Sequence, residues 1–448
     1  MSQPPEDVPA AGAQAGARPA GPQVPLAPVP LTTVLREWGR IGCLGFGGPP
    51  SHIRLLRQLV VERRGWLDAR EFEDAIAVCN MMPGPASTQL AIFCAWRLRG
   101  RAGALVGGAG FILPGLVVIL ALSVLFLAGT PPLWVLGAGA GAGAAVPAVA
   151  VQAGWSLVGP SWQKKAATFR WICYVVAGLA AAPTIGPWLV LVLLGCGVVE
   201  LLARRRSTAD AGPGAAGTGA GGDGTGPNVT DGDGGTGGTR ARSDDSGGSG
   251  TQGRLHGLVA APALVLAVGG GVLASVAWEA FKIGGLSFGG GFVIIPLMQA
   301  DVVGHYHWMS GAQFLNAVAL GQITPGPVVQ TVAVVGYAAA GIVGGLLASA
   351  VAFTPSFLFV LFGGPRFDQI RGDARARAFL DGAGPAAIGA IFGSAIALTR
   401  VLSHPWQYAV LAGALALLLP LRRGVVLALL SAAAIGVVIA LAAGTVTP

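Results

Sequence analysis

Four short breaks of glycine and proline interrupt the apolar sequence and mark where this chain could bind a ligand. Two are Phe-Gly-Gly (46–48 and 288–290) and two are Pro-Gly-Pro (83–85 and 325–327). Two prolines remove two amide donors, so neither Pro-Gly-Pro can lie inside a continuous helix. A helix that restarts after such a break points free N–H groups toward it, which suits a small oxyanion. Glycines before a helix let the backbone itself close on a ligand.

The predicted binding residues are the breaks and the polar side chains around them. They are Gly47, Gly48, His52, Asn80, Pro83, Gly84, Pro85, Thr88 and Gln89, followed by Gly289, Gly290, Asn316, Gln322, Thr324, Pro325, Gly326, Pro327 and Gln330. Most of the polar ones are neutral hydrogen-bonding groups, which hold an anion without trapping it. The alternative is that these side chains only satisfy broken backbone or hydrogen-bond between helices.

Two charged pairs lie in the same apolar stretches. Arg40 and Lys282 precede the Phe-Gly-Gly breaks, and Glu37 and Glu279 stand one helical turn earlier. The cations are predicted to attract an oxyanion, and the glutamates to carry a coupling proton. The alternative is that each pair snorkels to the interface or forms a structural i, i+3 ion pair. His52 lacks a partner in the second copy, which would make the site asymmetric.

The elements that position these residues occur twice. Phe46 and Phe288, Trp66 and Trp308, and Pro83 and Pro325 are each 242 residues apart, and so are residues Arg40 to Gln89 from Lys282 to Thr331. An ungapped match of this kind is an internal duplication. Breaks at matching positions of two repeats point to a binding site at the repeat interface of a transporter.

The composition predicts an all-α polytopic membrane protein. Of the 448 residues, 53% are hydrophobic and 11% are charged, and the mean hydropathy is +0.67. Soluble domains carry about 25% charged residues. The net charge of +8 does not indicate nucleic-acid binding, because the arginines lie in short clusters between apolar segments.

The chain divides into six predicted segments. They are a disordered tail (1–30), a first membrane repeat (31–203), a Gly-rich cytoplasmic linker (204–256), an extra transmembrane helix (257–275), a second repeat (276–443) and a C-terminal tail (444–448). The linker composition has no reason to fold. The extra helix has no counterpart in the first half, so it would invert the second repeat.

Lys and Arg alternate along the connections and predict opposite orientations of the repeats. Connections 97–101 and 153–170 and the start of the linker are basic, whereas 129–132 and 183–187 hold none. In the second half, 365–377 and 421–423 are basic and 339–342 holds none. The positive-inside rule then places the N-terminus and linker in the cytoplasm and the C-terminus outside. The same rule favours re-entrant hairpins for the broken segments 34–56, 75–96, 276–298 and 311–338.

The paired motifs resemble the chromate transporter family in its long, two-domain form. The resemblance rests on Phe46-Gly47-Gly48-Pro49, Trp66-Leu67, Phe72 and Met82-Pro83-Gly84-Pro85, with their echoes at 287–291 and 321–327. It implies proton-motive-force-linked export of chromate, with sulfate as the related oxyanion.

We therefore expect an inner-membrane secondary transporter of a tetrahedral oxyanion, most simply chromate efflux that gives chromate resistance. A sulfate or other oxyanion carrier is the alternative, and a membrane-embedded reductase a remote one. No phosphate-loop, nucleophile-elbow or zinc-protease motif occurs, so no catalytic residue, metal or cofactor is predicted. The expected partners are the anion and the bilayer but no nucleic acid, and assembly into a homo-oligomer stays open.

Overall fold

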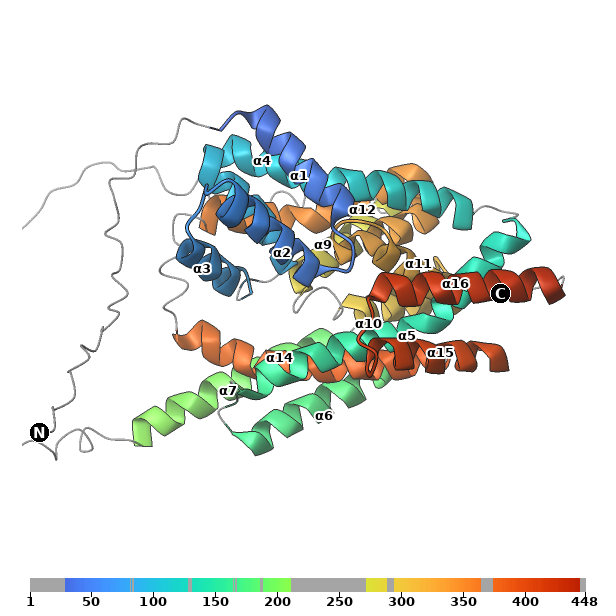
Figure 1. The fold of residues 1–448 in the computed structure, drawn as a ribbon. Coiled ribbons are helices and arrows are strands. Elements are labelled where there is room, and N and C mark those ends of the chain that lie inside the picture. The colour runs from blue at the N-terminus through green and yellow to red at the C-terminus, as the bar shows by residue number, and fades with distance from the viewer. Residues whose placement is uncertain are drawn as a thin grey trace, which may run out of the picture.

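The computed structural model describes residues 29–80, 82, 84–127, 131–163, 165, 167–185, 188–210, 271–287, 294–363 and 374–443. Within these ranges the regular elements are all helices (Figure 1). Residues 1–28 and 444–448 of the predicted tails, most of the linker and residues 257–270 of the predicted extra helix lie outside the described residues.

The described residues of the first half form seven α-helices and one π-helical turn. They are α1 (Leu31–Leu44), α2 (Pro49–Arg57), η1 (Gln58–Arg63), α3 (Ala69–Cys79), α4 (Ala86–Phe126), α5 (Leu133–Gln163), α6 (Thr168–Thr184) and α7 (Leu189–Asp210). Two of these helices extend beyond the predicted apolar spans. Helix α5 continues through most of the predicted connection 153–170, and α7 continues past residue 203 into the predicted linker.

The second half repeats this order. Its elements are α9 (Val272–Leu286), α10 (Ile294–Gln299), η3 (Ala300–His305), α11 (Gly311–Ile323), η4 (Val328–Gln330), α12 (Thr331–Gly363), α14 (Ala374–Thr399), α15 (Pro405–Leu418) and α16 (Val425–Ala443). The π-helical turns η1 and η3 occupy corresponding residues. Such turns are rare and are frequent at functional sites.

Local sequence explains where the short helices begin. Gly48 has a φ of 78° directly before Pro49, the first residue of α2. Asp68 caps α3 by accepting a hydrogen bond from Glu71 N at 2.9 Å. Ser310 and Gln313 form a capping box at the start of α11. Both repeats therefore use a strong helix start after the π-helical turn.

The elements α4 and α12 are each divided into two helical segments by a sharp turn. The non-helical residues are Arg99 and Gly100 in α4 and Ala340 and Gly341 in α12. The chain reverses direction at these residues, because a Cβ atom on Gly103 would lie 2.1 Å from the Ala95 carbonyl oxygen and one on Gly344 would lie 2.1 Å from the Gly336 carbonyl oxygen. The predicted connections 97–101 and 339–342 are therefore turns, each joining two helical segments that pack against one another. Gly100 and Gly341 are 241 residues apart, one fewer than the spacing up to Pro-Gly-Pro. The stretch from Pro327 to Gly341 is thus one residue shorter than the corresponding stretch from Pro85 to Gly100. The tight 3₁₀ turn η4 replaces α-helix at the start of this shorter stretch.

The helices form two layers, and each repeat contributes to both (Figure 1). In the upper layer α1 packs on α4, α9 packs on α12, and α4 packs on α12. In the lower layer α5 packs on α15 and α16 of the second repeat, while α14 packs on α6 and α7 of the first. This reciprocal exchange joins the two repeats into one body.

Five described helices are long and apolar enough to cross a membrane. They are Ala86–Phe126, Leu133–Gln163, Val328–Gly363, Ala374–Thr399 and Val425–Ala443. The protein is therefore an all-α membrane protein, as composition predicts. Helices α1 and α9 are much shorter, since 14 and 15 residues span about 21–23 Å.

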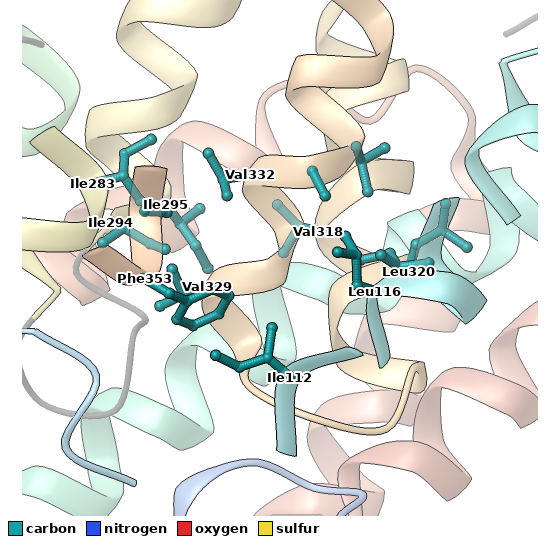
Figure 2. Close-up of a cluster of buried hydrophobic side chains, with 14 of the residues drawn as sticks. Ile112, Leu116, Ile283, Ile294, Ile295, Val318, Leu320, Val329, Val332 and Phe353 are labelled. Atoms are coloured by element: carbon teal, nitrogen blue, oxygen red, sulfur yellow. The ribbon is translucent and has the colours of Figure 1, made fainter. Parts of the chain in front are cut away.

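Apolar side chains from both repeats lie around the second Pro-Gly-Pro. Figure 2 shows Ile112 and Leu116 of α4 in one cluster with residues of the second repeat, among them Val329 of η4 and Phe353 of α12. The second Pro-Gly-Pro is itself buried, so a polar contact there meets little competition from bulk water.

Candidate functional site

The breaks of the two repeats meet directly. The backbone N–H of Gly326, in the second Pro-Gly-Pro, donates to the carbonyl oxygen of Gly45 at 3.0 Å. Gly45 ends α1 and immediately precedes the first Phe-Gly-Gly. This hydrogen bond joins two residues about 280 positions apart in sequence. It links the end of α1 in the first repeat with the Pro-Gly-Pro of the second.

Each Pro-Gly-Pro also lies against the proline-containing part of the other repeat's long helix. A Cβ atom on Gly326 would lie 3.7 Å from Cα of Gly115, which follows Pro114 of α4. A Cβ atom on Gly84 would lie 3.3 Å from Oγ of Ser356, which follows Pro355 of α12. Gly115 and Ser356 follow prolines at corresponding positions of the two repeats. The Pro-Gly-Pro glycine of each repeat therefore contacts the equivalent place on the other repeat.

Two buried glutamines stand beside the paired glycines. Gln330 donates from Nε2 to the Ile112 carbonyl at 2.6 Å, and its Oε1 would lie 3.0 Å from a Cβ on Gly326. Nε2 of Gln89 would lie 2.5 Å from a Cβ on Gly84. The structure therefore equates Gln89 with Gln330, and the constant spacing that pairs Gln89 with Thr331 is wrong by one residue.

His52 connects the first Phe-Gly-Gly with the first Pro-Gly-Pro. Its side chain is fully buried, and Nε2 lies 2.9 Å from the Gly45 carbonyl oxygen. Nδ1 lies 3.4 Å from Oγ of Ser87, at the start of α4, and Phe111 meets the ring edge-on. The Gly45 carbonyl is thus shared by His52 and Gly326.

Several other buried polar atoms near the helix ends lack a hydrogen-bond partner among the described residues. They are Thr88 Oγ1, Ser287 Oγ, Gln322 Nε2, Gln330 Oε1 and Ser356 Oγ. Buried polar groups are normally satisfied, so a set of this size marks hydrogen-bonding capacity that the fold leaves unused. Thr324, by contrast, donates to its own helix at Leu320 O, 2.9 Å away.

Not every predicted residue lies in this buried set. Asn80 is exposed at the end of α3, and Asn316 packs against Gly139 and Gly143 of α5. The backbone of Gly47 and Gly48 turns through positive φ between α1 and α2. The last group of predicted residues comprises Pro83, Gly289 and Gly290, which fall outside the described residues, and Pro85, Pro325 and Pro327, which supply only backbone.

The first charged pair faces an open, basic cavity. This cavity of about 700 Å³ is lined by Arg36, Glu37, Arg40, Leu59, Arg63 and Arg64. Glu37 forms an ion pair with Arg64, and Arg40 is exposed. Four arginines against one glutamate give the cavity a positive potential that favours anions.

The second charged pair is closed and acidic. Lys282 Nζ lies 2.6 Å from Glu279 Oε2 and also contacts Asp301 of η3. The Glu279 and Asp301 side chains are only 1% and 6% exposed. Sequence reasoning missed Asp301, although a carboxylate between the apolar residues Ala300 and Val302 is a recognisable signal.

A third ionic cluster was also missed. Glu200 of α7 is buried and accepts from Arg170 Nε at 2.9 Å, Arg204 Nε at 3.1 Å and the Tyr174 hydroxyl at 3.1 Å. Arg204 also reaches Asp381 of α14 at 2.7 Å. This network ties α6 and α7 of the first repeat to α14 of the second. Its partners are far apart in sequence, so only the fold reveals it.

Comparison with known proteins agrees with the two-repeat arrangement. The family model described as "Chromate transporter" matches residues 32–201 and again residues 274–437. The chain belongs to the chromate transporter family. Members of this family are transporters, so a small oxyanion is the coarse substrate class that the family implies.

Three relatives are similar to the chain over most of their length. The chain is 28% identical to a chromate transport protein of Cupriavidus metallidurans, covering 81% of this chain and 80% of the relative. It is 28% identical to a chromate transport protein of Pseudomonas aeruginosa, covering 84% and 83%. It is 25% identical to an uncharacterised transporter of Methanocaldococcus jannaschii, covering 74% and 75%. No solved structure matches the chain.

Proposed function

We propose that this protein exports chromate across the plasma membrane by secondary active transport and thereby gives chromate resistance. The observation that carries the proposal is the junction between repeats, where Gly326 N–H meets Gly45 O at 3.0 Å inside an apolar shell. An anion held at this junction would meet helix N-termini and neutral side chains rather than a fixed countercharge. Such a site binds a divalent oxyanion yet releases it.

The proposed binding residues surround this junction. Gln89, Gln330 and Ser356 are buried next to the two Pro-Gly-Pro glycines, and His52 and Thr88 are buried on the side of the first repeat. The helix starts at Ala86 and Val328 direct their first N–H groups toward the same region. Gly289 and Gly290 belong to the proposal through the repeat alone.

The basic cavity around Arg40 is proposed as the cytoplasmic entrance. Its four arginines would raise the local concentration of a divalent anion before it reaches the junction. This placement assumes the orientation from the arginine alternation, with the N-terminus and linker cytoplasmic and the repeats inverted. The reciprocal packing of α5 and α14 supports a two-fold relation between the repeats, which an inverted pair requires.

A sulfate carrier with the same architecture is the main competing function. Chromate and sulfate share charge and tetrahedral shape, so backbone N–H donors separate them only weakly. A reductase would need a redox cofactor, and its haem or flavin absorption in the purified protein would reveal it.

The test is chromate accumulation in everted membrane vesicles that contain the protein, with and without an imposed proton gradient. Gradient-dependent uptake that sulfate inhibits is the expected result, because uptake into everted vesicles corresponds to export from cells. Sulfate counterflow without any chromate movement would replace chromate by sulfate. Movement of neither anion would contradict oxyanion transport.

A further inference from the structure

Lys282 bridges two buried carboxyl groups that flank the second Phe-Gly-Gly break. Glu279 lies on α9, before the break, and Asp301 lies on η3, after it. Lys282 Nζ is 2.6 Å from Glu279 Oε2 and also contacts Asp301 Oδ2. The three side chains, called the α9 triad below, therefore connect the two segments that the break separates.

The α9 triad carries one negative charge in excess when all three groups are ionised. Burial of an uncompensated charge costs several kcal/mol, and two carboxylates in one site resist ionising together. A single proton bound to either carboxyl group removes this excess. Glu279 Oε1 has no hydrogen-bond partner among the described residues, so it is open to a proton.

The surroundings supply little competing charge. Tyr306, directly after η3, bonds Ser275 through its hydroxyl, and the His305 ring stacks edge-on against Tyr306. Helix α12, which packs on α9, has no charged residue between Thr331 and Gly363, and α10 has none between Ile294 and Gln299. Elements farther out contribute Arg170, on α6, and Arg375, Arg377 and Asp381, on α14. The excess charge of the triad is thus not neutralised by the helices that touch it.

The corresponding place in the first repeat lacks this property. Leu59 stands where Asp301 would be, and Glu37 is paired with Arg64 beside three further arginines. Glu37 is therefore surrounded by abundant positive charge. The two glutamates that the repeat makes equivalent are chemically different.

We propose that Glu279 and Asp301, bridged by Lys282, form the proton-coupling site and that Glu37 does not participate. This inference rests on the proposed oxyanion transport. The proton adds to one carboxylate oxygen from one side of the membrane and leaves the same oxygen toward the other, with no other bond made or broken. Its binding weakens the bridge from α9 to η3, and this changes how firmly the two sides of the break are held together.

The test compares Glu279→Gln and Asp301→Asn with the matched control Glu37→Gln. Each variant is assayed for chromate exchange at equal pH and for accumulation driven by a pH gradient. A gradient of one pH unit is worth about 1.4 kcal/mol, or about tenfold in accumulation for one coupled proton. We expect both triad variants to lose this gain while exchange continues, and Glu37→Gln to keep its ratio of driven to exchange transport. Driven accumulation like the wild type in either triad variant would overturn the proposal.

A second measurement does not depend on transport. Infrared difference spectra of the purified protein, recorded against pH, report a protonated carboxyl group through its C=O stretching band. The band is expected in the wild type and Glu37→Gln and should vanish in Glu279→Gln or Asp301→Asn. Its presence in a protein that moves no anion would reject the proposed function and keep the proton site. Its absence in an active transporter would reject the triad. Both substitutions remove the excess negative charge of the α9 triad, so both variants are expected to fold. If one of them does not fold, the other still tests the proposal.

Discussion

The charged pair on α1 and the charged pair on α9 hold equivalent places in the two repeats but lie in opposite environments. Arg40 is exposed in a basic cavity, whereas Lys282 is enclosed by Glu279 and Asp301. The difference follows from few positions, chiefly Leu59 against Asp301 and Arg64 against Tyr306. Duplication supplies two copies of the same helix arrangement. A few substitutions can then adapt one copy to bind the anion and the other to bind a proton.

The strongest test of this contrast is to remove each cation separately. Lys282→Met leaves two buried carboxylates without a counter-ion, which is expected to destabilise the protein by about 3–5 kcal/mol. Arg40→Met removes an exposed charge, for which about 0–1 kcal/mol is expected. Thermal unfolding in detergent, followed by tryptophan fluorescence, measures the difference. Equal midpoints for the two variants would contradict the contrast. The double variant Lys282→Met with Glu279→Gln should recover part of the loss.

Unlike substitutions of the charged residues, substitutions of the Pro-Gly-Pro glycines should have similar effects on transport in both repeats. Gly84 and Gly326 have φ values of 122° and 104°, which a β-branched residue adopts only under strain. Gly84→Val and Gly326→Val are each expected to lower the chromate transport rate by about 100-fold, as a small misplacement of site groups does. Gly413→Val, in open space on α15, is the control for insertion and expression. Full transport by both break variants would show that the breaks do not form the site.

Substitutions at Gly115 and Ser356, which lie against the two Pro-Gly-Pro glycines, should lower the transport rate to different extents. A Cβ on Gly115 would lie 2.2 Å from the Pro325 carbonyl oxygen, so Gly115→Ala forces the backbone apart. Overpacking of this kind costs about 1–3 kcal/mol, which corresponds to a loss of about fivefold to 150-fold in the transport rate. Ser356→Ala removes only a hydroxyl and should change the transport rate by less than about threefold. Initial rates at saturating chromate distinguish the two, and a neutral Gly115→Ala would disprove close packing at this contact.

The smallest expected effect concerns the basic cavity. Raising the ionic strength from about 0.01 M to about 1 M shortens the Debye length from about 30 Å to about 3 Å. The apparent KM for chromate should then rise about threefold in the wild type, because attraction to exposed arginines is screened. Arg40→Gln combined with Arg63→Gln should flatten this salt dependence. An unchanged salt dependence in the double variant would remove the cavity from the anion pathway.

The breaks that the structure describes were predictable because glycine and proline act locally on the backbone. Pro-Gly-Pro ends a helix wherever it stands, and the positive φ of Gly48 before Pro49 is a local requirement as well. The same holds for the all-α membrane class, which follows from composition. The family resemblance, carried by these motifs, is confirmed by the two matched regions.

The contacts between repeats were not predictable, since they depend on how distant helices cross. Ser356 and Gly115 are ordinary small residues until each is found against the other repeat's Pro-Gly-Pro. Glu200 and Asp381 look like separate charges but share Arg204. The one-residue shift that pairs Gln89 with Gln330 stayed hidden because Thr331 offered a plausible ungapped match.

The hydrogen bond between Gly326 and Gly45 uses only main-chain atoms, and this affects how the sequence of the protein can evolve. Side chains that do not force this backbone apart can change over generations without deleting the bond, because among substitutions only proline at residue 326 removes the donor N–H itself. The two halves of the gene can therefore drift apart while the link between their products persists. A fused duplicate is freer to specialise than two separate genes, because the partner that completes each joint is always inherited with it.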